Sequence, residues 1–444
     1  MGPKRAQVVP MPFGKKEPEA KSVDISADIC GVHFPNPFVL SSATPTMHAE
    51  NVKVGIEAGW GGAVLKTLFP AEHSRVYARP RFKVFWLKDQ PGYPQHIPRS
   101  YTITCIEDAS DLSPEDYEKD VNESKRLVGE NGVVIASIMA SDMETWEKYM
   151  ELINGTKADM VELNFGCPYA GEPGTKEEGP MLGWRLVQMG EEVVRLAKRK
   201  LAIPFSPKIS SQVGEVDIWA DRFEKAGAPC LTLSHRISGI WIDIEKARPY
   251  PFGSITGFGG PYLIGFSLKW VAKSRRKVQV PIMGNMGVYD WQDVVRFIMV
   301  GADVVQSCSA VMIQGYDIVK AWRAMLVKFM EEHGYSSLKD MKGIALPYIV
   351  AADKVERGAP GIYAVVNEDK CTGCGICKRT CFHFAMDLVP PNNKARVNLR
   401  KCAGCGLCAE LCPVDAISMQ KLANLDLYPR SKPYHKYFPY TGPP

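Results

Sequence analysis

Residues 371–381 read Cys371-Thr372-Gly373-Cys374-Gly375-Ile376-Cys377-Lys378-Arg379-Thr380-Cys381, and the same cysteine spacing recurs from Cys402 to Cys412. The second run is Cys402-x-x-Cys405-x-x-Cys408-x-x-x-Cys412, followed by a proline. Two such runs are the bacterial-type signature of a pair of [4Fe–4S] clusters, because each cluster needs four thiolate ligands. Glycines between the cysteines allow the tight turns that bring three of them to one cluster. The sequence therefore predicts a small α+β ferredoxin-type domain with two [4Fe–4S] clusters over residues 362–420.

The fourth cysteine of each run is predicted to bind the cluster of the other run, as it does in proteins with two such clusters. The predicted ligand sets are Cys371, Cys374, Cys377 and Cys412 for one cluster, and Cys402, Cys405, Cys408 and Cys381 for the other. Zinc or disulfides are the alternative interpretation, but zinc ribbons use two close cysteine pairs rather than runs of four.

The chain has 444 residues, enough for one large and one small domain, and its net charge of +5 is spread along the sequence. That distribution gives a nucleic-acid partner little support. Five of the 13 cysteines lie outside the two runs and are scattered, which is typical of a reducing compartment, so we expect a cytoplasmic protein. The sequence contains no run of 18 apolar residues, so no membrane span is predicted. Residues 1–22 lack the apolar core of a secretory signal and are expected to form a loose arm.

Upstream of the cysteine runs, eight short apolar runs recur, mostly separated by segments of helical pattern. Continuous apolar runs suit parallel strands buried on both faces, and eight strand–helix units over about 270 residues predict a (β/α)8 TIM barrel. A doubly wound sheet is the alternative, but no G-x-G-x-x-G follows the first run. The runs are Phe38–Thr44, Gly62–Thr67, Val133–Ala140, Met160–Cys167, Phe205–Ile209, Cys230–His235, Val280–Asn285 and Val304–Ala310. The helix candidates between them are Glu144–Leu152, Gly190–Arg199, Ile218–Ala226, Leu268–Lys273 and Trp291–Val300.

The predicted domains follow from these patterns. The barrel is expected over residues 23–333, closed by a helix at Gly315–His333, and a helical linker over residues 334–361 leads to the cluster domain. Residues 421–444 form a tail without a clear element. Two long loops, Phe69–Ser113 and Pro168–Met189, follow the second and fourth strands and are expected to be lids or binding loops on the catalytic face.

Most strands are predicted to end in a polar or small residue, and the carboxyl ends of barrel strands carry the active site. The last two strand–helix loops commonly bind phosphate, and here they read Gly284-Asn285-Met286-Gly287 and Ser307-Cys308-Ser309-Ala310. Ordinary tight turns are the alternative. A phosphate site beside an iron–sulfur module indicates FMN, which exchanges a hydride with an organic substrate and single electrons with clusters. Lys66 and Lys208 end neighbouring strands and are candidates for the cation near the flavin N1, with exposed rim residues as the alternative.

Cys167 ends the fourth run in Glu162-Leu163-Asn164-Phe165-Gly166-Cys167-Pro168 and opens the second long loop. Hydride transfer at a carbon next to C=C or C=O requires a proton to move on the neighbouring carbon. A thiol held close to that carbon can act as the general acid or base. A buried structural cysteine is the alternative, since cysteine is often buried for packing alone.

Several of these stretches carry a family resemblance. They are Asn36-Pro37-Phe38, Ser42-Ala43-Thr44-Pro45, Ala58-Gly59-Trp60-Gly61, Lys66-Thr67, Ala136-Ser137-Ile138-Met139, Glu162-Leu163-Asn164, Cys167-Pro168, Cys308-Ser309-Ala310-Val311 and both cysteine runs. With them the barrel segment resembles the class 1 dihydroorotate dehydrogenases. Residues 23–420 resemble the flavin-plus-ferredoxin portion of the dihydropyrimidine dehydrogenase family, including its bacterial catalytic subunits.

The resemblance implies roles for individual residues. Cys167 matches the family's catalytic cysteine, a proton donor or acceptor, while Asn164 and Glu107 match residues that contact substrate. The cofactor-binding residues predicted for FMN are Ala43, Lys66, Thr67, Lys208, Ser234, Gly260, Gly287, Cys308 and Ser309. The resemblance also implies a two-fold dimer within a heteromer.

Three departures from the family concern the substrate. Where the pyrimidine enzymes have an Asn-Thr pair, this chain has His235 and Arg236; Cys105 replaces an asparagine, and Gly166 replaces a serine. Asn and Thr match a neutral amide–imide edge, whereas His and Arg supply donors and positive charge suited to an anion. His235 and Arg236 are therefore predicted substrate contacts, with Arg236 pairing with a surface acid as the alternative.

The sequence thus predicts an FMN and iron–sulfur oxidoreductase that moves electrons between the clusters and an activated C=C or CH–CH bond, with Cys167 transferring the proton. Dihydropyrimidines and a different anionic or aromatic unsaturated carbonyl compound are both open as substrates. An electron-transfer subunit without an organic substrate is the third hypothesis. Because the chain lacks a nicotinamide-binding fingerprint, we expect a partner subunit carrying FAD and an NAD(P) site, or a soluble ferredoxin.

Overall fold

The computed structural model describes residues 23–70, 77, 79–85, 99–106, 109–165, 184–212, 214–250, 253–355 and 362–421. Two compact units divide the chain, Met1–Ile349 and Val350–Pro444. Among the described helices none is long and apolar enough to cross a membrane.

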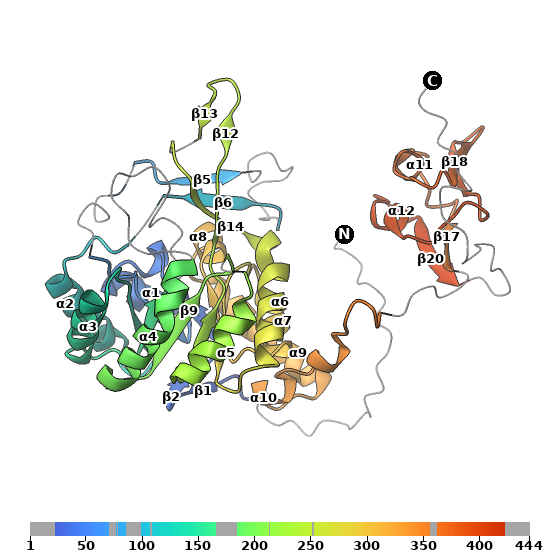
Figure 1. Cartoon of the computed structure of the whole chain (residues 1–444). Coiled ribbons are helices and arrows are strands. Elements are labelled where there is room, and N and C mark those ends of the chain that lie inside the picture. The colour runs from blue at the N-terminus through green and yellow to red at the C-terminus, as the bar shows by residue number, and fades with distance from the viewer. Residues whose placement is uncertain are drawn as a thin grey trace. The chain divides into compact units, whose positions relative to one another are not determined.

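The first unit is built on a closed barrel of eight strands, in the order β10-β15-β16-β3-β4-β7-β8-β9, and every neighbouring pair is parallel (Figure 1). Each strand lies within one of the eight predicted runs, which confirms the (β/α)8 fold and excludes the doubly wound sheet. The strands are β3 (Phe38–Leu40), β4 (Gly62–Val64), β7 (Val133–Ile138), β8 (Met160–Asn164), β9 (Phe205–Ile209), β10 (Leu231–Leu233), β15 (Ile282–Gly284) and β16 (Val304–Ser307).

Helices surround the barrel, and all five predicted between the strands are present. Three more, α1, α2 and α8, were not predicted, although Ser113 and Pro114 mark the start of α2: the Ser113 Oγ accepts a hydrogen bond from the Asp116 backbone N–H at 3.1 Å. The helices are α1 (Ala49–Ala58), α2 (Pro114–Val128), α3 (Met143–Asn154), α4 (Trp184–Lys200), α5 (Val216–Ala226), α6 (Ile264–Arg275), α7 (Trp291–Met299), α8 (Ser309–Gln314) and α9 (Ile318–His333).

The amino-terminal end of the barrel is sealed by a hairpin of β1 (Ala27–Ile29) and β2 (Val32–Phe34). Ile29 and Phe34 are fully buried and pack with inward-facing strand residues such as Val39 and Ile135. This apolar plug lies at the opposite end from β5 and β6 (Figure 1). Polar side chains inside the barrel are therefore concentrated towards its carboxyl end.

A four-stranded antiparallel sheet covers that carboxyl end, in the order β11-β14-β6-β5 (Figure 1). It combines two strands from the first predicted long loop, β5 (Phe82–Phe85) and β6 (Thr102–Cys105), with β11 (Ile237–Gly239) and β14 (Thr256–Gly259). Thr104 and Thr256 join β6 to β14 through a buried hydroxyl pair at 2.6 Å. A small hairpin, β12 (Ile242–Asp243) and β13 (Arg248–Pro249), extends between β11 and β14. The first long loop thus carries ordered strands. In the second predicted long loop, residues 168–183 lie outside the described residues, and α4 begins at Trp184.

Beyond α9, the segment predicted as a helical linker contains the short helix α10 (Leu338–Met341) and a 3-10 turn at Leu346–Tyr348. The second unit contains β17 (Ile362–Val366), α11 (Ile376–Arg379), β18 (Met386–Val389), β19 (Lys394–Val397), α12 (Leu407–Glu410) and β20 (Ile417–Lys421). β17 pairs with β20 and β18 with β19, both antiparallel, so the unit is the predicted small α+β ferredoxin fold.

Candidate functional site

A cavity enclosing about 910 Å³ of unfilled space, part of it open to solvent, lies at the carboxyl ends of the barrel strands. It brings together most of the predicted site residues. Ala43, Lys66, Thr67, Asn164, Lys208, His235, Arg236, Gly260, Gly287, Cys308 and Ser309 all line it. Ser234 does not line it, and Glu107 and Cys167 lie outside the described residues.

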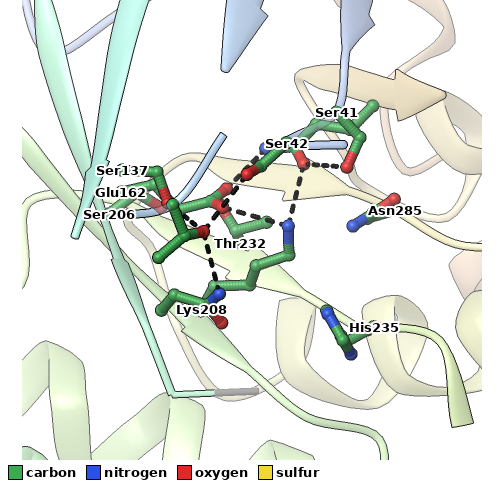
Figure 2. Close-up of polar contacts among 12 residues, drawn as sticks. Ser41, Ser42, Ser137, Glu162, Ser206, Lys208, Thr232, His235 and Asn285 are labelled. Carbon is green, nitrogen blue, oxygen red and sulfur yellow. Dashed lines mark hydrogen bonds and ion pairs between the residues drawn. The ribbon is translucent and has the colours of Figure 1, made fainter. Parts of the chain in front are cut away.

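Lys208 is held by a buried ion pair. Its Nζ lies 3.0 Å from Oε1 of Glu162 and 3.4 Å from Oε1 of Gln306, and the Gln306 Nε2 donates to Glu162 Oε2 at 2.8 Å. Figure 2 shows the Lys208 side chain extending towards Glu162, away from His235. The side chains of Lys208 and Glu162 are 2% and 0% exposed, so the alternative of an exposed rim lysine is wrong. Glu162 was not predicted as the partner of Lys208. The available signal was a carboxylate inside an otherwise apolar strand, because a buried charge requires a partner of opposite charge.

Hydroxyl groups cluster around Thr67, the residue after Lys66. Thr67 Oγ1 lies 2.8 Å from the Ser137 Oγ and 3.2 Å from the Ser42 Oγ, and it accepts from Asn164 Nδ2 at 3.1 Å. Lys66, one residue earlier, is 4% exposed. This network fixes the orientation of the Asn164 amide at the cavity wall, where a substrate amide or carbonyl can hydrogen-bond to it.

Two glycines, Gly260 and Gly287, contribute bare backbone to the cavity wall. Gly287 has φ +84°, and a Cβ there would lie 2.3 Å from the Ile264 backbone nitrogen; a Cβ on Gly260 would lie 2.5 Å from the Tyr101 carbonyl oxygen. Backbone therefore approaches backbone at both positions, which only glycine permits. The buried Ser307 Oγ beside them has no hydrogen-bond partner in the described part of the chain. A bare backbone wall with an unpaired hydroxyl fits the phosphate of FMN.

His235 follows Ser234, a non-glycine residue with φ 79°. The His235 Nδ1 lies 3.0 Å from the Arg236 carbonyl oxygen, to which it donates. Burial lowers the pKa of His235 well below its usual range, and the positive charges of Lys208, Arg236 and Lys66 lower that pKa further. His235 is therefore neutral at pH 7, so the positive charge predicted for the pair rests on Arg236 alone.

In the second unit, the cysteines surround two cavities enclosing about 330 and 350 Å³ of unfilled space. Cys371, Cys374, Cys377 and Cys412 line the first. Cys381, Cys402, Cys405 and Cys408 line the second. The fourth cysteine of each run thus lies with the first three of the other. Among the described residues, no group of three or more His, Cys, Asp or Glu side chains is arranged to hold a single metal ion.

Backbone groups support the cysteines. Backbone N–H groups donate to three sulfurs: Ala385 to Cys381 at 3.3 Å, Ala395 to Cys371 at 3.4 Å and Ala416 to Cys412 at 3.2 Å. Burial raises the pKa of Cys408 to about 11, with a further contribution from the charges of Cys402, Cys405 and Cys381. A thiol that resists ionisation by itself, together with backbone N–H donors aimed at sulfur, fits thiolate ligands whose charge is taken up by an iron cluster.

Two family models match the sequence: dihydroorotate dehydrogenase over residues 111–330 and 4Fe-4S dicluster domain over residues 364–419. The chain is 30% identical over 409 residues to the NAD-dependent dihydropyrimidine dehydrogenase subunit PreA of Escherichia coli K12, covering 89% of this chain and 95% of that protein. It is 30% identical over 325 residues to the catalytic subunit of dihydroorotate dehydrogenase B (NAD(+)) of Methanothermobacter thermautotrophicus, covering 72% and 98%. The chloroplastic dihydropyrimidine dehydrogenase (NADP(+)) of Arabidopsis thaliana is 26% identical over 383 residues, covering 80% and 87%.

Proposed function

The chain belongs to the dihydroorotate dehydrogenase family of oxidoreductases, and we propose that it exchanges electrons between two [4Fe–4S] clusters and an activated carbon–carbon bond, with FMN in the barrel. The observation that carries the proposal is the cavity of about 910 Å³, which gathers the predicted flavin and substrate residues at the catalytic end of the barrel. FMN, when bound, supplies the hydride transfer and the one-electron exchange that side chains cannot perform.

The residues proposed to hold FMN divide by role. Gly260, Gly287, Cys308 and Ser309 form the phosphate end, where backbone amides approach closely. Lys66 and Lys208 place positive charge at the ring end. Ala43, Thr67 and Ser234 complete the proposed set; Ala43 and Thr67 line the cavity, whereas Ser234 does not.

Cys167 is proposed to move the proton. In reduction of a C=C bond, a hydride adds to one carbon and the Cys167 thiol gives its proton to the neighbouring carbon; the resulting thiolate is reprotonated by solvent. Asn164, the last residue of β8, is proposed to hold the substrate by its amide. The reverse reaction uses the thiolate as base.

The two cysteine sets are proposed to hold the clusters with the crossed ligands that line each cavity. Two of the relatives are named as subunits of NAD-dependent enzymes. We therefore propose that this chain works as a homodimer within a heteromer whose other subunit carries FAD and an NAD(P) site. A soluble ferredoxin is the alternative electron partner.

The proposal is tested on protein purified without oxygen and reduced stoichiometrically. Uracil, thymine, orotate and a panel of other unsaturated carboxylates are added, and flavin and cluster absorbance is followed. We expect at least one compound to reoxidise the protein rapidly. If none does, the proposed reaction is wrong and an electron-transfer subunit without organic substrate is favoured.

Cys167→Ala separates the same two functions. Loss of a general acid should slow reoxidation by substrate by about 10²–10⁴-fold. Electron exchange with an artificial acceptor such as ferricyanide should stay unchanged, since it needs no proton donor at that position. An unchanged rate with substrate would remove Cys167 from the mechanism.

A further inference from the structure

The hairpin that seals the amino-terminal end of the barrel turns on a cysteine. Ile29 of β1 pairs directly with Val32 of β2, so Cys30 and Gly31 alone form the turn. Their φ angles are 52° and 82°, as in a type I′ turn, whose two central positions favour Asn, Asp or Gly. A cysteine with positive φ is uncommon, so the backbone of this turn does not by itself account for Cys30.

The Cys30 side chain lies beside a second cysteine. The Cys30 Sγ donates to the Pro229 carbonyl oxygen at 3.1 Å, and that carbonyl belongs to the peptide bond leading into Cys230. The Cys230 Sγ donates to the Phe205 carbonyl oxygen at 3.4 Å. Both cysteines pack into the apolar plug that contains Ile29, and their thiols lie within hydrogen-bonding reach of each other. Two cysteines far apart in the sequence are therefore neighbours in space.

The two thiols differ in access and in acidity. Cys30 is part-exposed, whereas Cys230 is fully buried. The hydrogen bond from the Cys230 thiol lowers the pKa of Cys30, against the opposing effects of burial and of the Asp303 charge. The same hydrogen bond raises the pKa of Cys230 well above its usual range, and burial raises it further. Cys30 therefore ionises first, and the thiolate is the form of cysteine that attacks a disulfide.

We propose that Cys30 and Cys230 form an oxidisable pair, in which Cys30 reacts with a low-molecular-weight disulfide and Cys230 converts the product into an intramolecular disulfide. The Cys30 thiolate attacks one sulfur of the external disulfide, whose S–S bond breaks and releases one thiolate. The Cys230 sulfur then attacks the Cys30 sulfur, and the second external thiol leaves with the Cys230 proton. The two cysteines together lose two electrons, and the external disulfide gains them.

The resulting bond ties the plug to the barrel wall. It joins the β1–β2 hairpin to the residue before β10 and closes a loop that contains most of the barrel strands. A covalent link across a long loop restricts the unfolded chain and so stabilises the folded one. In a reducing compartment the pair remains as thiols, so the link forms only when the surroundings become oxidising.

The test uses the holoenzyme, kept without oxygen and equilibrated in glutathione buffers rich in either the disulfide or the thiol. Remaining thiols are blocked by alkylation, and the peptides are identified by mass spectrometry. We expect a peptide pair linked through Cys30 and Cys230 that is at least about 10-fold more abundant in the disulfide-rich buffer and is lost after dithiothreitol. Thermal unfolding, followed by tryptophan fluorescence, should shift upward by several degrees in that buffer.

Two single variants separate the roles of the cysteines. Cys230→Ser removes the resolving thiol and should accumulate glutathione on Cys30 in place of the link. Cys30→Asn suits the turn better than cysteine does, so the hairpin should fold, and the buried Cys230 should stay unmodified. Neither variant should show the upward shift in unfolding temperature. His33→Ala, an exposed substitution on β2 of the same hairpin, is the matched control and should form the link as the parent does.

Three results would overturn the inference. The first is a parent protein without the link in the disulfide-rich buffer, including one that carries glutathione on Cys30 and goes no further. The second is a link from Cys30 to another cysteine, or to a second copy of the chain, in place of Cys230. The third is a Cys30→Asn variant in which Cys230 takes up glutathione as readily as Cys30 does in Cys230→Ser.

Discussion

Lys208 and Glu162 form an ion pair of 3.0 Å in the barrel interior, where neither side chain is more than 2% exposed. Because Gln306 bonds to both partners, the pair is satisfied from a third strand. Glu162 offsets the charge of Lys208, and the ion pair fixes the direction in which the Lys208 ammonium group points.

Removing one member of this pair should destabilise the barrel strongly. Glu162→Gln or Lys208→Met leaves a buried charge without its partner, which costs about 3–5 kcal/mol. The double variant should be less destabilised than the sum of the two, because no uncompensated charge is left. Urea unfolding of flavin-free protein, followed by tryptophan fluorescence, measures all three. If the free energy of unfolding of either single variant lay within about 1 kcal/mol of the parent value, the ion pair would not be a buried pair of this kind.

Stability should fall below about pH 6.5 in a way that depends on His235. Its pKa in the folded protein is lowered, so the folded state resists a proton that the unfolded state accepts near the ordinary value of 6.5. Acid therefore favours unfolding, by up to about 1.4 kcal/mol per pH unit for one histidine. His235→Gln should flatten the decline of melting temperature as pH falls from 6.5. Parallel curves for parent and variant would show that His235 titrates normally.

Double cysteine variants should reveal the crossed ligand sets through iron content. Parent protein should hold about eight iron atoms, and loss of one cluster should leave about four. Cys371→Ser with Cys412→Ser removes two ligands of one cavity and should leave about four. Cys402→Ser with Cys412→Ser removes one ligand from each cavity and should leave few. Cys230→Ser, in the barrel, is the control and should keep the full content. If instead the Cys402→Ser, Cys412→Ser variant kept about four iron atoms and the Cys371→Ser, Cys412→Ser variant kept few, each cluster would be bound by the four cysteines of a single run.

Gly287→Ala should lose flavin. The substitution places a side chain at φ +84°, costing about 1–2 kcal/mol, and sets its Cβ against the Ile264 backbone. The neighbouring Gly265→Ala is the matched control, because a Cβ there meets nothing within 4 Å and alanine favours the helix. The ratio of flavin to protein absorbance after purification measures both. Full flavin content in Gly287→Ala would exclude this wall from the phosphate site.

The barrel could be predicted from sequence because its signal is local. A run such as Val133–Ala140 is apolar except for Ser137, and such a run predicts a strand buried on both faces whichever strands it pairs with. Strand ends were placed too late, as at Phe38–Thr44, where β3 stops at Leu40 and Thr44 starts a 3-10 turn. Apolar pattern alone does not mark where hydrogen-bonded pairing stops.

The sheet over the cavity could not be predicted, because its strands are short and its pairing is distant. Thr104 and Thr256, which meet across β6 and β14, are 152 residues apart. Neither Phe82–Phe85 nor Thr102–Cys105 differs in pattern from a loop rich in aromatic residues. For the same reason the sequence shows Cys105 and Arg236 only as two separate departures from the family, whereas in the structure the Arg236 Nη1 lies 2.6 Å from the Cys105 Sγ.

The pairing of β3 with β16 has a consequence for synthesis of the chain. Ser41 and Gln306 meet across this seam although 265 residues separate them. The barrel therefore stays an open sheet until nearly all of the first unit has left the ribosome, and such distant contacts form slowly. Gly287 and Ser309 follow late in the sequence, so the flavin pocket is among the last parts to exist. In the described part of the second unit, both strand pairs lie within residues 362–421, so these sheets can form before the barrel is complete.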